Sequence, residues 1–99
     1  MATENDIVLI YYEDQPLSFA RIEAILPDSK PNWYHVRLLM LQVPLQMVTW
    51  ILRDVYINGE EFTMNAKRMR LEKVVAPEMT DTPQQPPQKE PAENKNRGS

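Results

Sequence analysis

The hydrophobic residues of this chain are confined to one region, and their distribution limits the chain to a single small domain. More than half of the residues from Asp6 to Val75 are hydrophobic, whereas only three of those in residues 76–99 belong to this class. A folded unit of about 70 residues buries roughly 60% of the surface that its unfolded chain exposes, so one core fits and a second does not. We therefore predict a flexible N-terminus over residues 1–5 and one domain over residues 6–75.

Residues 76–99 differ in kind from this domain. They contain five of the nine prolines of the chain, no bulky aliphatic side chain and charged residues of both signs. Such a segment cannot bury enough apolar surface to offset the entropy that is lost when it becomes ordered. We predict that it forms a disordered C-terminal tail.

The residue types that usually carry catalysis or bind cofactors are scarce. The chain has no cysteine, a single histidine (His35) and two glycines, which excludes disulfides and argues against a zinc-ligand set or a phosphate-binding glycine loop. We therefore predict a non-enzymatic protein with no catalytic residue, no metal and no cofactor. The alternative is a small hydrolase or transferase in which His35 works with one of the acids Glu13, Asp14, Asp28 and Asp54.

Membrane and export signals are missing from the sequence. The residues before Ile7 carry two acids, no base and no apolar run, unlike a signal peptide. The longest apolar region, Val36–Leu52, is interrupted by polar residues and by Pro44, and it is shorter than the ~20 apolar residues that span a bilayer. We expect a cytoplasmic protein without membrane contact.

Several segments alternate apolar and polar residues with the period of two that is typical of half-buried strands. This pattern predicts strands at Ile7–Tyr12, Ser18–Leu26, Trp33–Leu41 and Met69–Val75. Within the third segment, the better core face is formed by Tyr34, Val36, Leu38 and Met40.

The region over residues 44–57 is compatible with two structures. Pro44 cannot donate a ladder hydrogen bond, so strand pairing should break near it. Many β-branched and aromatic residues favour a strand, whereas a polar stripe and a helix-ending Gly59 fit a helix; we favour the strand. The pair Asn58-Gly59 tolerates the positive φ angles of a type I′ turn, which predicts a hairpin between residues 55–57 and 60–64.

Five to seven short strands in so short a domain predict an all-β fold, either a small barrel or a strongly bent antiparallel sheet. Ser18–Ile25 is similar to a second strand of the aromatic, Ala, Arg, aliphatic kind, and Trp33–Leu38 is similar to a strand that begins with Trp-Tyr and then alternates. Together they resemble SH3-like small barrels, and more narrowly Tudor-type modules, over about residues 7–75. This resemblance implies a binding module and does not identify its ligand.

Three aromatic residues are candidates for ligand binding. Tyr12, Trp33 and Tyr34 lie near the ends of predicted strands, where their rings could stack on a peptide, a base or a methylated cation. The alternative is that the rings cap the core.

A basic cluster close to the end of the domain is a candidate for nucleic-acid binding. It consists of Lys67, Arg68, Arg70 and Lys73. Its arginines would face solvent from one side of a strand, where they could meet phosphates. The alternative is a surface on which the hairpin acids Glu60 and Glu61 neutralise these charges.

The segment Val36–Leu52 carries apolar residues on both faces. One face is therefore a candidate for self-association, with the residues Leu39, Leu41, Val43 and Trp50. The alternative is a strand that is covered on both faces within one monomer.

Taken together, these features predict a non-enzymatic binding or assembly module. Its expected partner is a protein segment or peptide, or a second copy of the chain in a homo-oligomer. The alternative function is nucleic-acid binding through the basic cluster.

Overall fold

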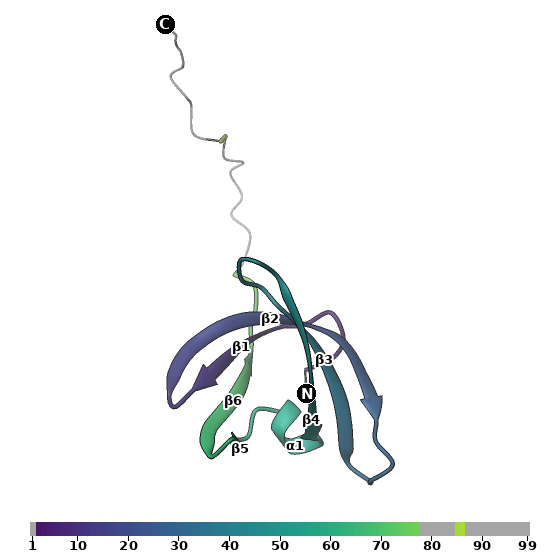
Figure 1. Cartoon of the computed structure of the whole chain (residues 1–99). Helices are drawn as coiled ribbons and strands as arrows, with labels where there is room; N and C mark the ends of the chain where they lie inside the picture. Colours follow the sequence, from purple (N-terminus) through teal and green to yellow (C-terminus); the bar gives the residue numbers. More distant parts are fainter. Residues whose placement is uncertain (1, 78–84, 87–99) are drawn as a thin grey trace, which may run out of the picture.

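The computed structural model describes residues 2–77 and 85–86 of the chain (Figure 1). The predicted tail over residues 76–99 therefore lies mostly outside the described residues. Within them the chain forms six strands and one helical turn: β1 (Ile7–Tyr12), β2 (Gln15–Pro27), β3 (Trp33–Met40), β4 (Gln46–Arg53), α1 (Asp54–Ile57), β5 (Phe62–Met64) and β6 (Lys67–Lys73).

The strands form one antiparallel sheet in the order β4-β3-β2-β1-β6-β5. The sheet curls into a half-barrel, with the long β2 strand bending across its back (Figure 1). The predicted all-β, strongly bent sheet of five to seven strands is thus confirmed. Strand β1 begins and ends at the predicted residues, and the chain leaves the sheet between β3 and β4, around Pro44, as expected.

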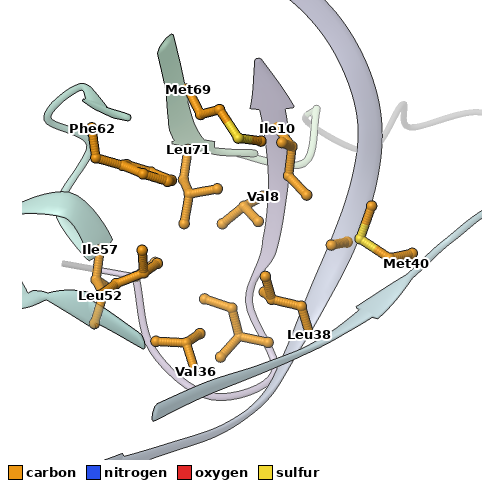
Figure 2. Close-up of a cluster of buried hydrophobic side chains, with 13 residues drawn as sticks. Val8, Ile10, Val36, Leu38, Met40, Leu52, Ile57, Phe62, Met69 and Leu71 are labelled. Carbon is orange, nitrogen blue, oxygen red and sulfur yellow. The ribbon is translucent and has the colours of Figure 1, made fainter. Parts of the chain in front are cut away.

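The inner face of the half-barrel holds the core (Figure 2). Val36 and Leu38 of β3 point into it, as the alternation predicts, and Met69 and Leu71 of β6 meet them from the other side. Along β2 the register shifts between Ile22 and Ala24. Because a bulge moves later side chains to the opposite face, Ile25 packs against the core while Leu26 is exposed.

Residues 2–5, part of the predicted N-terminal segment outside the domain, pack against β2. Ala2 is buried, and the Asn5 N–H donates to the Ile22 carbonyl at 2.7 Å. The Glu4 carboxylate accepts a hydrogen bond from the Ile25 N–H at 3.1 Å. Strand β1 begins at Ile7, opposite Arg21, so the backbone groups of β2 beyond Arg21 have no partner in β1, and the N-terminal segment satisfies some of them.

The predicted hairpin at Asn58-Gly59 is wrong. Residues 54–57 form the helical turn α1, and the chain turns away after it at Gly59, which has a φ of 113°. The region therefore combines both predicted structures, a strand over Gln46–Arg53 and then a helical turn. The turn prevails because it places Ile57 in the core, at the open side of the half-barrel.

Two hairpins use two-residue loops in which both residues have positive φ, as type I′ turns require. The first, between β1 and β2, has Glu13 and Asp14 at 50° and 67°. The second, between β5 and β6, has Asn65 and Ala66 at 54° and 65°. The second loop lies at residues for which the sequence analysis predicted no turn.

Side chains close the half-barrel where the strands do not meet. Trp50 of β4 and Phe62 of β5 lie edge to face with ring centroids 6.4 Å apart, and Tyr56 of α1 lies 5.4 Å from Phe62. Strands β4 and β5 share no backbone hydrogen bond in the part of the chain that the structure describes. Aromatic packing, with α1 as a plug, therefore joins the two ends of the sheet.

Candidate functional site

The outer face of the sheet carries a group of apolar side chains, which we call the outer apolar surface. Its members face away from the core on four neighbouring strands and the loop after β3: Leu9, Leu17, Phe19, Leu39, Leu41 and Met47. Leu9 pairs with Phe19 across β1 and β2, and the Leu41 N–H donates to the Phe19 carbonyl at 2.9 Å. Met47 is the cross-strand neighbour of Leu39.

Part of the outer apolar surface is hollowed. An open depression is lined by Leu9, Pro16, Leu17, Ser18, Phe19, Leu41 and Gln42. Phe19 is 48% exposed and Leu17 is 56% exposed, which is unusual for large apolar residues in a domain with so little core. A contiguous exposed apolar surface is the usual mark of an interaction site.

The loop of residues 41–45 extends this surface. Val43 is fully exposed, and Leu45 is exposed as well. The peptide bond between Val43 and Pro44 is cis. Of the residues predicted for self-association, Leu39 and Leu41 belong to the outer apolar surface, where Leu39 is half-buried and Leu41 is exposed, and Val43 lies in the loop next to it.

Trp50, the fourth residue predicted for self-association, lies on the opposite face. Its cross-strand neighbour is the buried Val36, and its indole packs against the core. Sequence reasoning grouped it with the outer residues because both faces of this segment are apolar. Only the strand register separates them.

Strand β4 presents a free edge. The Asp54 N–H donates to the Asn32 carbonyl at 3.0 Å, in continuation of the β3–β4 register. Since hydrogen-bonded and non-hydrogen-bonded pairs alternate along an antiparallel ladder, the backbone groups of Met47, Thr49 and Ile51 point away from β3. No backbone partner for these groups is present in the described structure.

The three aromatic candidates do not form one site. Trp33 packs edge to face on Tyr56 at 6.3 Å, with the Lys30 ammonium 5.0 Å from its ring centre. Tyr34, the next residue on β3, packs against the core. Tyr12 is the last residue of β1 and Trp33 is the first residue of β3. The two therefore lie near opposite ends of the long strand β2, which runs from the β1–β2 turn to the loop before β3 (Figure 1).

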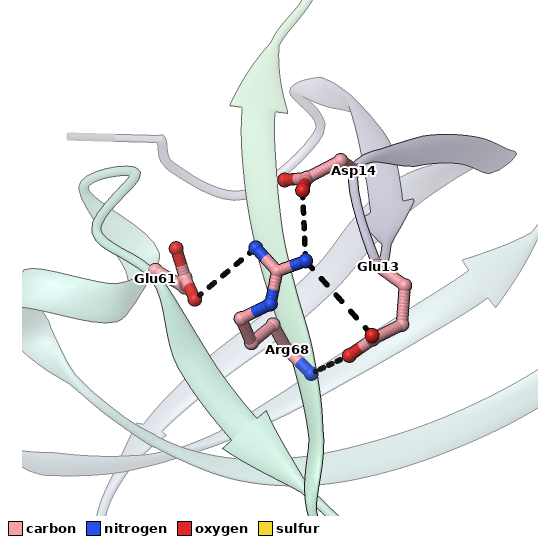
Figure 3. Close-up of polar contacts among 4 residues, drawn as sticks. All are labelled: Glu13, Asp14, Glu61 and Arg68. Atoms are coloured by element: carbon pink, nitrogen blue, oxygen red, sulfur yellow. Dashed lines mark hydrogen bonds and ion pairs between the residues drawn. The ribbon is translucent and has the colours of Figure 1, made fainter.

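Carboxylates surround the centre of the basic cluster (Figure 3). The Arg68 guanidinium lies 2.8 Å from Asp14, 3.8 Å from Glu61 and 3.9 Å from Glu13. The backbone N–H of Arg68 also donates a hydrogen bond to the Glu13 carboxylate at 2.6 Å. The hydrogen bond between Arg68 and Asp14 raises the pKa of Arg68 and lowers that of Asp14. Glu61 was one of the two acids expected to pair here.

The other basic residues are also engaged or lie apart. Arg70 stacks on the Tyr11 ring at 3.7 Å and lies 3.6 Å from Glu72. Lys73 lies 3.6 Å from Asp6. Lys67 is exposed at the first position of β6. The four residues thus form a surface on which acids offset most of the positive charge.

His35 pairs with only one of the four acids that were considered for acid–base chemistry. Its Nε2 lies 2.7 Å from Asp28 Oδ1, and this hydrogen bond lowers the pKa of Asp28. The pair links β3 to the loop that follows β2. An exposed His–Asp pair between neighbouring segments is a common structural contact.

No helix in the described residues has the length and hydropathy needed to cross a membrane. Comparison of the chain with protein-family models, curated proteins and solved structures gave no match.

Proposed function

We propose that this domain is a non-enzymatic binding module that recognises a protein segment through the outer apolar surface. One observation carries the proposal: four large apolar side chains, Leu17, Phe19, Leu41 and Met47, are exposed on the outer face of the sheet, beside the half-buried Leu9 and Leu39. Burying such a surface against an extended or helical segment removes apolar area from water, which contributes a favourable free energy of roughly 25 cal/mol for each Å².

Two further features support a module that binds rather than catalyses. The site is built on paired strands, which already hold Phe19 and Met47 in place. Binding at these residues therefore does not lose the entropy that ordering a flexible loop would cost. Polar residues such as Ser18 and Gln42 lie at the depression and could orient a bound backbone. The resemblance to SH3-like and Tudor-type modules remains a prediction, as does the cytoplasmic location.

The nucleic-acid alternative has less support. Phosphate binding releases counterions when lysines and arginines are free to approach the backbone. Here Arg68 already has three acidic neighbours, and Arg70 is stacked on Tyr11. A phosphate would have to displace or overcome these carboxylates.

The experiment is a selection of peptides from a random library displayed on phage, with the full chain as bait. The Phe19→Asp variant is matched by Leu26→Asp, because both residues lie on β2 and both are 48% exposed, but Leu26 lies outside the outer apolar surface. We expect selected peptides to bind the wild type and Leu26→Asp and to lose binding to Phe19→Asp. Peptides that bind all three proteins equally would overturn the proposal.

A further inference from the structure

We infer that two copies of this chain join through their β4 strands, which pair antiparallel about a two-fold axis at Thr49. This inference rests on the proposed function in part, because it names a second copy as one partner of the module. It starts from the free edge of β4, where the backbone groups of Met47, Thr49 and Ile51 lack a partner in the described structure.

The geometry of the edge selects the register. A new strand can form hydrogen bonds only with residues whose backbone N–H and C=O groups point away from β3, and in β4 these are the odd-numbered residues. In a pair of β4 strands, odd-numbered residues must therefore face odd-numbered residues. With the axis at Thr49, that residue faces the partner's Thr49, and Met47 faces the partner's Ile51. By symmetry, Ile51 faces the partner's Met47. Each of these three pairs is joined by two N–H···O hydrogen bonds.

The side chains are self-complementary in this register. Thr opposite Thr and Met opposite Ile are favourable cross-strand pairs, and the pairing brings no like charges together. Moving the axis to Trp50 would instead place Arg53 opposite the partner's Met47, next to α1, which begins at Asp54. The axis at Thr49 keeps the contact within Gln46–Leu52, a stretch without charge.

Strand β4 also lacks the features that protect edge strands in monomeric proteins. Such strands usually carry a lysine, a proline, a bulge or an inward-pointing charge. Residues 46–52 contain none of these residues, and the β3–β4 register runs without a shift. The proline that precedes the strand, Pro44, lies outside the segment that pairs.

Other segments of the chain do not suit the edge. Residues 76–99 hold five prolines and no bulky aliphatic residue, so they can neither donate a full ladder nor offer apolar side chains to Met47 and Ile51. Strand β5 is three residues long and already pairs with β6. A second β4 strand supplies both the backbone groups and the matching side chains.

Pairing would also enlarge the outer apolar surface. Met47 belongs both to the free edge and to that surface, so the two surfaces of a dimer become continuous across the axis. A dimer could then hold two protein segments side by side, or one longer segment, with a gain in avidity.

The test is sedimentation velocity of the full chain over a wide concentration range, for the wild type and for variants that carry a charge at residue 49, which lies on the axis. Thr49→Lys and Thr49→Glu each place like charges opposite each other and should raise the dimer dissociation constant by roughly tenfold or more. An equimolar mixture of the two should form a heterodimer, because lysine then faces glutamate. Thr49→Val, which keeps the backbone and the β-branched shape, should remain dimeric. Amide spectra of each variant verify the fold.

The results separate this inference from the proposed function. A wild type that is monomeric throughout, or a dimer that neither charged variant weakens, would overturn β4 pairing. A dimer that Phe19→Asp dissociates while Thr49→Lys does not would also overturn it and would place self-association on the outer apolar surface. A monomer that still binds selected peptides in a Phe19-dependent manner would overturn only the dimer.

Discussion

Trp50 and Phe62 meet edge to face with ring centroids 6.4 Å apart, although the strands that carry them lie at opposite ends of the sheet. Their contact replaces the hydrogen-bonded ladder that would close a complete barrel. Tyr56 of α1 lies beside Phe62 at 5.4 Å and completes the seam. Strand order alone would leave the two edges unconnected.

This seam predicts measurable coupling between the two rings. Phe62→Leu and Trp50→Leu should each reduce the free energy of unfolding, and the double variant should lose about 1 kcal/mol less than the sum, the value of a direct aromatic pair. Urea denaturation of the four proteins in the cycle provides the measurement. Strict additivity would show that the rings stabilise the fold independently.

Gly59 should be difficult to replace. Its φ of 113° is rarely adopted by residues with a Cβ, although an added Cβ would find ordinary contact distance, 3.5 Å, to the Leu71 carbonyl oxygen. We expect Gly59→Ala to destabilise the domain by about 1–2 kcal/mol, since the cost is backbone strain rather than a clash. Asn58→Ala, at a φ of −81°, serves as the neighbouring control and should cost less. Equal losses in thermal unfolding would contradict this explanation.

The ion pair between Arg68 and Asp14 predicts how the stability of the domain depends on pH. Arg68 lowers the pKa of Asp14 below its ordinary value of 3.8, so the folded state favours the ionised carboxylate. The contribution is present above that ordinary value and is lost as the pH falls through the lower folded value. Arg68→Gln should therefore show a smaller decrease in the free energy of unfolding as the pH is lowered through this range. A wild-type and variant pair with parallel pH profiles would exclude the linkage.

Ala2 offers a test of the N-terminal segment. Because its side chain is buried in the core cluster, Ala2→Asp should place a charge in an apolar environment and lower the free energy of unfolding by about 2 kcal/mol or more. Ala66→Asp is the matched control, because Ala66 is exposed in a turn at a positive φ that aspartate tolerates. Similar stability of the two variants would show that the N-terminal contact contributes little.

Local alternation predicted much of the sheet, because each strand with one buried face reveals its period. Strand β1 and the inner face of β3 follow directly from it. Alternation does not locate a bulge, and so the exposure of Leu26 after the register shift in β2 could not be foreseen. The turn at Asn65 and Ala66 lacks the glycine that usually announces such a loop.

The candidate sites were predicted less well, because they depend on which strands become neighbours. The proximity of Phe19 to Leu41 arises from the pairing of β2 with β3, which no local pattern encodes. Trp50 and Met47 lie three residues apart on β4 and therefore point to opposite faces, but only the pairing with β3 shows which of the two faces the core. The helical turn over residues 54–57 overrides the strand preference of Val55 and Tyr56, since it fills the open side of the core.

The aromatic seam has a mechanical consequence. Separating β4 from β5 breaks no backbone hydrogen bond between them, so the half-barrel can widen along this line at a lower cost than peeling any paired strand apart. Ring packing is short-ranged and carries no net charge, so this resistance to widening should vary little with ionic strength, unlike the ion pairs on the outer surface. Hydrogen-bonded strands therefore hold the half-barrel together everywhere except between β4 and β5, where side-chain packing alone resists opening.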